Sequence, residues 1–328
     1  MKNIHNLLSN PKWFPYKFSS DYKDITFVKT TSEQLRKAPF LDSRFLTKSN
    51  EMVSLKVKEI SSAMLSPSKQ LAFIFHSAFC CSTLFAGALD KPKKTLVLKE
   101  PEIMMSLANA KRMIIRNNRP NQDYKILINL VMRLLSRPFS PQESIVIKPT
   151  NSANNLIVDI HEKDIPYIFI HSNFEDFLIS ILKKGEACKS FIRTQFNIFS
   201  LDQSIMSQIN PRQAMTLTDL QVAYFVWQHQ INIFQNFSHQ KLIIQDKYFL
   251  ENKEKTLFLA IEALNLKNSK AEILELISSD YFSKNIKSKD KALNAITRER
   301  EANKLRLHYD REINATLVWS RNLDLKTN

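Results

Sequence analysis

The chain has 328 residues, a formal net charge of +15 and 44% hydrophobic residues, 22 of them phenylalanine. This length and apolar content can fill one large α/β domain or two smaller ones. Only two glycines occur, Gly87 and Gly185. That argues against a GxxxxGK[ST] phosphate loop and a GxGxxG dinucleotide loop, because both need several glycines. The three cysteines form neither a disulfide framework nor a metal-binding pattern, so we expect no metal site.

The positive charge is spread along the whole chain, and no basic stripe interleaved with aromatic residues stands out. We therefore do not expect a nucleic acid partner, and a basic pocket for a polyanionic small cofactor accounts for the charge equally well. The first residues lack the long apolar segment of a secretory signal, and the cysteine pattern suits a reduced compartment, so a cytoplasmic location is expected. Residues 71–89 carry no formal charge, but polar side chains crowd their middle, and a membrane span is disfavoured.

Residues 1–69 read as an irregular and partly helical lead-in to an α/β domain over residues 70–328. Three prolines interrupt the first 42 residues, and Asp24–Lys29 alternates like a short strand. Met52–Ala63 is predicted to be helical. Asp42 and Arg44 favour a local ion pair over a role as ligands, because such pairs are common near protein surfaces.

The segment that follows reads as a strand, a tight loop and the start of a helix. Leu71–Phe75 is an apolar run suited to a buried strand, and Ser82–Leu89 is small and apolar at helical spacing. The free N–H groups and the positive dipole end of the first helical turn favour an anion in the loop. A plain buried strand and helix without a ligand is the alternative. The candidate binding residues are those of the loop and the first helical turn: His76, Ser77, Ala78, Phe79, Cys80, Cys81, Ser82 and Thr83.

Two further strands are predicted to bring charged residues beside this loop. Thr95–Lys99 is followed by Glu100, and Ser144–Lys148 ends in a lysine. Because ligands of an open parallel sheet lie beyond the carboxyl ends of its strands, these side chains are expected near the loop. There Lys99 could meet the charge of a bound anion, and Glu100 could take a proton from a hydroxyl or an amine. The alternative for these two residues is a helix-capping glutamate beside a solvated lysine. For Lys148 and the helix start that follows it, contact with a ligand and plain helix capping are equally favoured.

The rest of the chain alternates between strands and helices. Strands are predicted at Tyr167–Ile170 and Lys241–Gln245, and Asp246–Lys255 is expected to begin as a turn. Lys189–Pro211 shows no clear pattern. Helices are predicted at Glu102–Arg116, Asn121–Arg137, Phe174–Lys184, Thr218–Phe237, Thr256–Leu264 and Glu312–Leu323.

Three runs of this sequence resemble bacterial sulfotransferase-like proteins of the P-loop-type superfamily: FIFHSAFCCSTLFAGALD at 73–90, LKEP at 98–101 and IKPTNSA at 147–153. In that family the loop holds the 5′-phosphosulfate of 3′-phosphoadenosine 5′-phosphosulfate (PAPS), and it contains a basic residue, Ser, Gly and two hydroxyl residues. Here Ser82 and Thr83 match the hydroxyl pair, Phe79 stands at the basic position, and Cys80 and Cys81 replace Ser-Gly. The resemblance implies a three-layer α/β sandwich, with an open parallel sheet and helices on both faces.

The resemblance also implies an activity, the transfer of a sulfonate group from PAPS to a hydroxyl or amine of a small-molecule or glycan acceptor, without a metal. Glu100 would deprotonate the acceptor, and Lys99 would neutralise charge on the bridging oxygen. In the family, an Arg stands at the end of the strand that corresponds to Tyr167–Ile170, and a Ser follows about two helical turns later. Both residues bind the 3′-phosphate. In this sequence His171 or Ser172 takes the place of the Arg, and Ser180 matches the Ser.

Other functions stay open at this point. A non-catalytic nucleotide- or partner-binding protein on the same fold is the main alternative, and Phe79 at the basic position supports it. A kinase-like transferase is disfavoured because no Walker lysine follows a glycine. A redox role for Cys80 and Cys81 is a further hypothesis, because a thiol at a helix N-terminus has a lowered pKa. The sequence does not indicate the oligomeric state.

Overall fold

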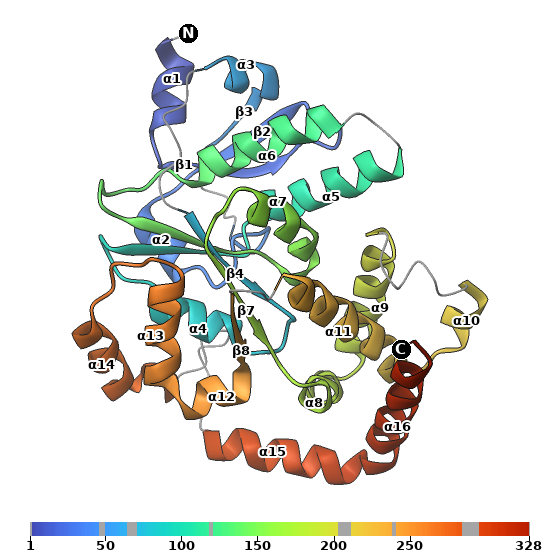
Figure 1. The fold of residues 1–328 in the computed structure, drawn as a ribbon. Coiled ribbons are helices and arrows are strands. Elements are labelled where there is room, and N and C mark those ends of the chain that lie inside the picture. Colours follow the sequence, from blue (N-terminus) through green and yellow to red (C-terminus); the bar gives the residue numbers. More distant parts are fainter. Residues whose placement is uncertain are drawn as a thin grey trace.

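In a computed structural model of the protein, residues 2–45, 50–63, 71–117, 121–202, 211–237, 241–283 and 295–327 are described. They form a central parallel sheet between two layers of helices, with a small antiparallel sheet to one side (Figure 1). The predicted fold class, α/β with an open parallel sheet and helices on both faces, is confirmed. None of the described helices combines the length and the apolar character needed to cross a bilayer.

The central sheet has the strand order β5-β6-β4-β7-β8, and each neighbouring pair is parallel. Its strands are β4 (Leu71–His76), β5 (Thr95–Lys99), β6 (Ser144–Lys148), β7 (Tyr167–His171) and β8 (Leu242–Gln245). The chain leaves the central strand β4 towards β5 on one side and later continues to β7 and β8 on the other. The carboxyl end of β4 therefore lies where the strand order reverses, which is where ligands of such sheets bind.

Alternate residues of β4, β5, β6 and β7 enter two separate cores, so these four strands are buried on both faces. Phe73 and Phe75 of β4 belong to one core, and Ala72 and Ile74 belong to the other. This explains why the strands read as continuous apolar runs in the sequence. The first core lies under α5 (Glu102–Arg116), α6 (Asn121–Leu135) and α7 (Ile157–Glu162). The second lies under α4 (Ser82–Leu89), α12 (Asp246–Glu251), α13 (Lys253–Ala263) and α14 (Lys270–Ser278).

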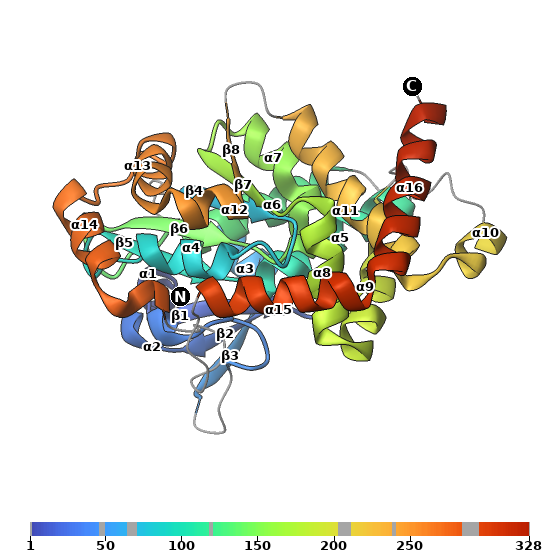
Figure 2. The ribbon, with the colours of Figure 1, turned by 90° about the horizontal axis from the view of Figure 1, so that it is seen from below.

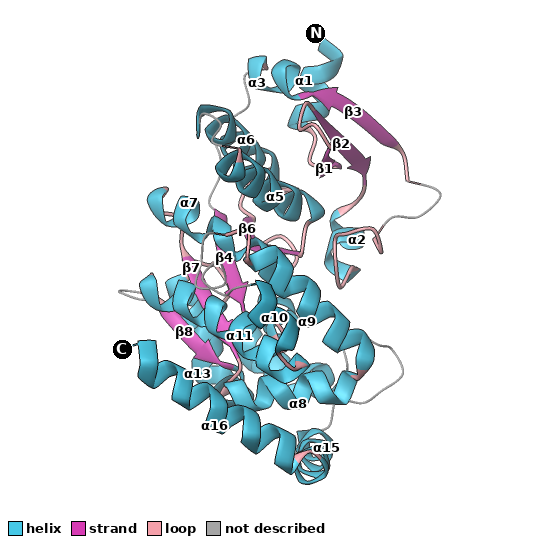
Figure 3. Cartoon of the chain, turned by 90° about the vertical axis from the view of Figure 1, so that its right-hand side faces the viewer, coloured by secondary structure: helices cyan, strands magenta, loops and turns pink. Residues whose placement is uncertain are grey.

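The N-terminal segment has more regular structure than the sequence predicts. Its elements are α1 (Lys2–Ser9), β1 (Trp13–Phe18), β2 (Asp24–Lys29), α2 (Ser32–Lys37), β3 (Met52–Lys56) and α3 (Val57–Ser62). The three strands form an antiparallel sheet in the order β1-β2-β3, apart from the central sheet (Figure 3).

Two predictions for this segment are therefore wrong. The first 42 residues are not irregular, because Pro15 lies beside a register shift on the edge strand β1, where a missing N–H is tolerated. The segment 52–63 is not wholly helical, because its first half alternates in exposure as a strand does. Phe27 of β2 lies in the same core as Phe73 of β4. The division of the chain at residue 70 stays a prediction.

A third core lies beside the sheet rather than on it. It joins α8 (Phe174–Lys184), α9 (Glu186–Phe199) and α11 (Asp219–Asn236) to α15 (Ala295–His308) and α16 (Asp310–Thr327). Figure 2 shows α15 leading into α16, which stands beside α11. The short elements η1 (Asn151–Leu156), α10 (Pro211–Thr216) and η3 (Asp280–Ser283) complete the described chain. The unassigned segment from residue 189 thus begins inside α9.

Gly185 separates α8 from α9, as the C-cap of the first helix and the N-cap of the second. Its backbone has φ +66° and ψ −152°, a region that only glycine occupies readily. An added Cβ would meet no atom within 4 Å, so steric conflict with neighbours is absent.

Gly185→Ala is expected to lower the free energy of unfolding by about 1–3 kcal/mol, because alanine must bear the cost of this backbone conformation. Urea denaturation would measure the change. Ser190→Ala, an exposed change on α9, is the control and should stay within about 0.5 kcal/mol of wild type. Equal stability of the two variants would show that the break between α8 and α9 does not need glycine.

Candidate functional site

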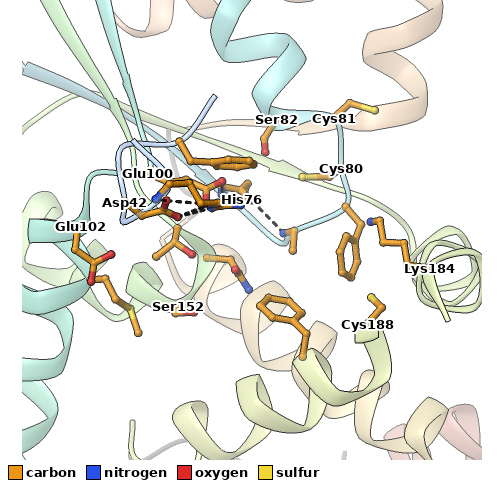
Figure 4. Close-up of a pocket in the computed structure, with 18 of the residues that line it drawn as sticks. Asp42, His76, Cys80, Cys81, Ser82, Glu100, Glu102, Ser152, Lys184 and Cys188 are labelled. Carbon is orange, nitrogen blue, oxygen red and sulfur yellow. Dashed lines mark hydrogen bonds and ion pairs between the residues drawn. The ribbon is translucent and has the colours of Figure 1, made fainter. Parts of the chain in front are cut away.

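A cavity of about 550 Å³ opens at the carboxyl ends of β4, β5 and β6 (Figure 4). Its walls come from the loop after β4, the segment after β5, the start of η1, the junction of α8 and α9, and residues 40–44. The volume is within the range of sites that bind small molecules.

The loop between β4 and α4 has an unusual backbone. Ala78, Phe79 and Cys81 have φ values of +67°, +52° and +56°, the left-handed region that costs a non-glycine residue about 1–2 kcal/mol. A left-handed residue next to a right-handed one turns successive backbone N–H groups to one side, as in anion-binding nests. Cys81 is the N-cap of α4, and Ser82 in its first turn lines the cavity. The expected order of strand, tight loop and helix N-terminus is confirmed.

His76 fixes the shape of this loop. Its Nδ1 accepts the N–H of Ala78 at 3.1 Å, so its Nε2 carries the proton and donates to the carbonyl of Pro149 at 3.0 Å. The imidazole is therefore neutral and joins the loop after β4 to the loop after β6. It also occupies the N–H of Ala78, which leaves that group unable to donate to a ligand.

The predicted loop residues divide into two groups. His76, Ala78, Phe79, Cys80, Cys81 and Ser82 line the cavity. Ser77 and Thr83 do not: Ser77 is fully buried, and its N–H donates to the carbonyl of Ile170. Thr83 is also buried, and its Oγ1 has no hydrogen-bond partner among the described residues.

Glu100 lines the other side of the cavity and pairs with Lys148, which lies behind the wall and does not line it, so the predicted ligand contact of Lys148 stays a prediction. Lys148 Nζ lies 2.6 Å from Glu100 Oε1, and the lysine side chain is completely buried. Glu100 has φ +53° and lines the cavity, with its side chain 16% exposed. The predicted proximity of Glu100 to the loop is confirmed, because His76 Nε2 lies 4.0 Å from Glu100 Oε1.

Lys99 is placed differently from the prediction. Its ammonium donates to the carbonyl of Arg36 in α2 at 2.6 Å, and the residue is not part of the cavity wall. Burial, together with the charges of Arg36 and Lys148, lowers the pKa of Lys99 to about 8. Lys99 and Lys148 are partners in the register of β5 and β6, and only Lys148 turns to the carboxylate of Glu100.

The residues expected to meet a 3′-phosphate lie outside the cavity wall. Ser172 is fully buried, and its Oγ has no hydrogen-bond partner among the described residues. The ring of His171 donates from Nδ1 to the carbonyl of Ser172, and burial lowers the pKa of this histidine. Ser180 is half-buried on α8. Ser172 nevertheless lies against the loop, because its N–H donates to Ser77 Oγ at 3.4 Å. None of the three residues lines the cavity, and their role stays a prediction.

The cavity floor is held by buried polar groups that the sequence reading missed. Gln195 of α9 accepts hydrogen bonds from Ser152 Oγ at 2.7 Å and from Asn151 Nδ2 at 3.3 Å. Gln230 of α11 donates to the carbonyl of Ser77 at 3.2 Å. A signal existed for Gln230, because it interrupts an otherwise apolar helix face, and polar groups in such positions are buried only with partners.

Charge is distributed unevenly around the cavity. Asp42, Glu100 and Glu102 lie on the left in Figure 4, and Lys184 lies on the right. Asp42 pairs with Arg44, as predicted, through Arg44 Nε at 2.9 Å. Burial and the charge of Asp42 raise the pKa of Glu102.

All three cysteines line the cavity. The expected lowering of the pKa does not hold for Cys80, because burial raises it to about 12 and Cys80 Sγ lies 3.3 Å from the carbonyl oxygen of Ile170. The thiol of Cys188 is also buried, and its pKa is raised. These two cysteines behave as small buried side chains rather than as reactive thiolates.

Comparison with solved structures matches the chain to the sulfotransferase domain of the olefin synthase from Synechococcus PCC 7002. The match has 13% sequence identity and a TM-score of 0.39, and it covers 74% of this chain and 88% of that one. No family model and no curated protein matches the sequence. At this identity and TM-score the likeness does not establish a shared activity.

Proposed function

We propose that this protein transfers a sulfonate group from PAPS to a hydroxyl or amine of a small acceptor. The observation that carries the proposal is the left-handed loop at residues 78–81. This loop delivers the N-terminus of α4 to a cavity whose opposite wall holds Glu100. The first N–H groups of α4 have no partner within the helix and favour an anion.

Bound PAPS would supply the sulfonate group, with adenosine 3′,5′-bisphosphate as its leaving group. The loop N–H groups and Ser82 would hold the phosphosulfate end, whereas the described residues at the end of β7 provide no cation for the 3′-phosphate. Glu100 would accept the proton of the attacking hydroxyl or amine, and Lys148 would hold the carboxylate in position through their ion pair. Positioning of the reactants and electrostatic stabilisation by fixed charges would supply most of the rate enhancement, as in phosphoryl transfer.

Calorimetric titration of the purified protein with adenosine 3′,5′-bisphosphate tests the proposal. Micromolar binding, weakened by salt and competed by PAPS, is expected because the ligand is polyanionic. Incubation with ³⁵S-labelled PAPS and a panel of amines and alcohols should then give labelled product. A non-catalytic binding protein on this fold would bind the nucleotide and release no labelled product. Absence of binding at millimolar nucleotide would overturn the proposal.

A further inference from the structure

Glu102, the first residue of α5, places a carboxylate in the wall of the cavity. Its N–H donates to the carbonyl of Leu41, which fixes the start of α5 against residues 40–44. Among the described residues, no group donates a hydrogen bond to this carboxylate or forms an ion pair with it. Lys17 of β1 is exposed and attracts it only from a longer distance. Glu102 therefore keeps its full capacity to accept hydrogen bonds from a ligand.

The charges around Glu102 favour a cation at this position. Figure 4 shows Asp42, Glu100 and Glu102 on the same side of the cavity. Asp42 is neutralised by Arg44, and the structure pairs Glu100 with Lys148. For Glu102, burial and the charge of Asp42 instead raise the pKa. Because an opposite charge nearby stabilises the ionised carboxylate, a cationic ligand group would gain free energy by binding here.

Asn151 adds a second hydrogen-bond acceptor to the wall of the same cavity. This residue begins η1, which packs against α5, and it is only 3% exposed. Its Nδ2 donates to Gln195 at 3.3 Å, whereas its Oδ1 accepts no hydrogen bond from any described residue. A buried amide oxygen in a cavity wall needs a donor, and a ligand with several N–H groups would supply one.

We infer that the acceptor of the proposed transfer is a cation, whose ammonium group is bound by Glu102 and Asn151 while its hydroxyl lies at Glu100. The inference rests on the proposed function for the reaction and adds the class of acceptor, amino alcohols including amino sugars. An ammonium group offers three donors and a positive charge, which suit a carboxylate and an amide oxygen. The acceptor hydroxyl oxygen forms the new bond to sulfur, and the bond from sulfur to the bridging phosphate oxygen breaks. Glu100 takes the hydroxyl proton.

Titration calorimetry on the full chain tests this inference with two probes of the same shape. These are para-(aminomethyl)benzyl alcohol, which is charged, and para-(hydroxymethyl)benzyl alcohol, which is neutral. Their ring suits the apolar side chains of Met105 and Phe191 in the cavity wall. Wild type is expected to bind the charged probe about tenfold or more tightly, the gain typical of one charged hydrogen bond.

Glu102→Gln should remove this preference and leave the affinity for the neutral probe close to wild type. Glu254→Gln is the matched control, because Glu254 also lies in the first turn of a helix, α13, but is exposed and outside the cavity wall. It should keep the preference. Thermal unfolding of Glu102→Gln should stay close to wild type, since the carboxylate has no partner among the described residues.

Turnover with labelled PAPS gives a second readout for Glu102. Glu102→Gln should raise KM for the charged probe by about tenfold and change kcat little, because the ammonium group is bound equally in the ground state and the transition state. A fall in kcat for both probes would instead show that Glu102 supports the structure of the site and does not select the acceptor.

The calorimetric titration needs no PAPS, so it separates this inference from the proposed function. A preference for the charged probe that depends on Glu102, without labelled product from any acceptor, would support the ammonium site and overturn sulfonate transfer. Equal affinity for the two probes, or a preference that Glu102→Gln keeps, would overturn the inference and leave the function standing. A wild-type protein that does not bind the charged probe at millimolar concentration would also overturn the inference.

Discussion

Replacement of Glu100 by Gln is expected to lower kcat for sulfonate transfer by about 10²–10⁴-fold, the range for loss of a general base. The amide keeps the shape of the side chain but cannot accept the acceptor's proton. Adenosine 3′,5′-bisphosphate should still bind nearly as tightly as to wild type, because the loop and α4 are unchanged. Single-turnover rates with labelled PAPS would measure the loss.

The stability of this variant needs its own control. Glu100→Gln leaves the ammonium of Lys148 completely buried without its carboxylate, which costs about 3–5 kcal/mol. Adding Lys148→Met removes the buried charge, so the double variant should regain most of the stability measured in urea and none of the turnover. If turnover returned with stability, Glu100 would act through folding alone. Lys99→Met, outside the cavity wall, should leave kcat close to wild type.

The central sheet and its helices could be predicted because their signals are local. β5 and β6 begin and end where the apolar runs Thr95–Lys99 and Ser144–Lys148 do, and α8 matches Phe174–Lys184. Buried parallel strands need continuous apolar runs, and helices show a period near 3.6, so both patterns appear in a single sequence. The turn expected after β8 is instead the helix α12, whose six residues are too few for a periodic signal.

The interior of the site was less predictable because its contacts join residues far apart in the chain. Lys99 and Lys148 both end strands, and only the packing of α2 against β5 decides that Lys99 binds the Arg36 carbonyl. Phe79 and Lys184 are far apart in the sequence, and yet Lys184 Nζ lies 3.6 Å from the centroid of the Phe79 ring. The sequence did contain one signal for the break between α8 and α9. The chain has only two glycines, and a glycine is favoured at backbone positions that other residues avoid.

The buried ion pair of Arg112 and Asp202 is expected to contribute strongly to the stability of the protein. Arg112 donates to both carboxylate oxygens of Asp202, at 2.8 and 2.7 Å, and to the carbonyl of Ser152 at 2.6 Å. Their side chains are 3% and 6% exposed. Because Ser152 lines the cavity, this pair fixes the floor of the site from α5.

Arg112→Met is expected to cost about 3–5 kcal/mol of unfolding free energy at pH 8, since it leaves the Asp202 carboxylate buried without its cation. Burial already raises the pKa of Asp202 against the opposing effect of Arg112, so removal of the arginine must raise it further. The folded variant then binds a proton more readily than its unfolded chain. Its loss of unfolding free energy relative to wild type should therefore become smaller as the pH falls from 8 to 5. Urea denaturation at both pH values would measure this trend.

The matched control is the exposed pair of Arg193 and Asp219, with side chains 45% and 30% exposed. Arg193→Met should cost at most about 1 kcal/mol because solvent screens such pairs. Asp202→Asn added to Arg112→Met removes the buried charge and should restore part of the stability at pH 8 but little at pH 5. A loss in Arg112→Met that is independent of pH, or no larger than that of Arg193→Met, would show that the pair is hydrated and does not hold the cavity floor.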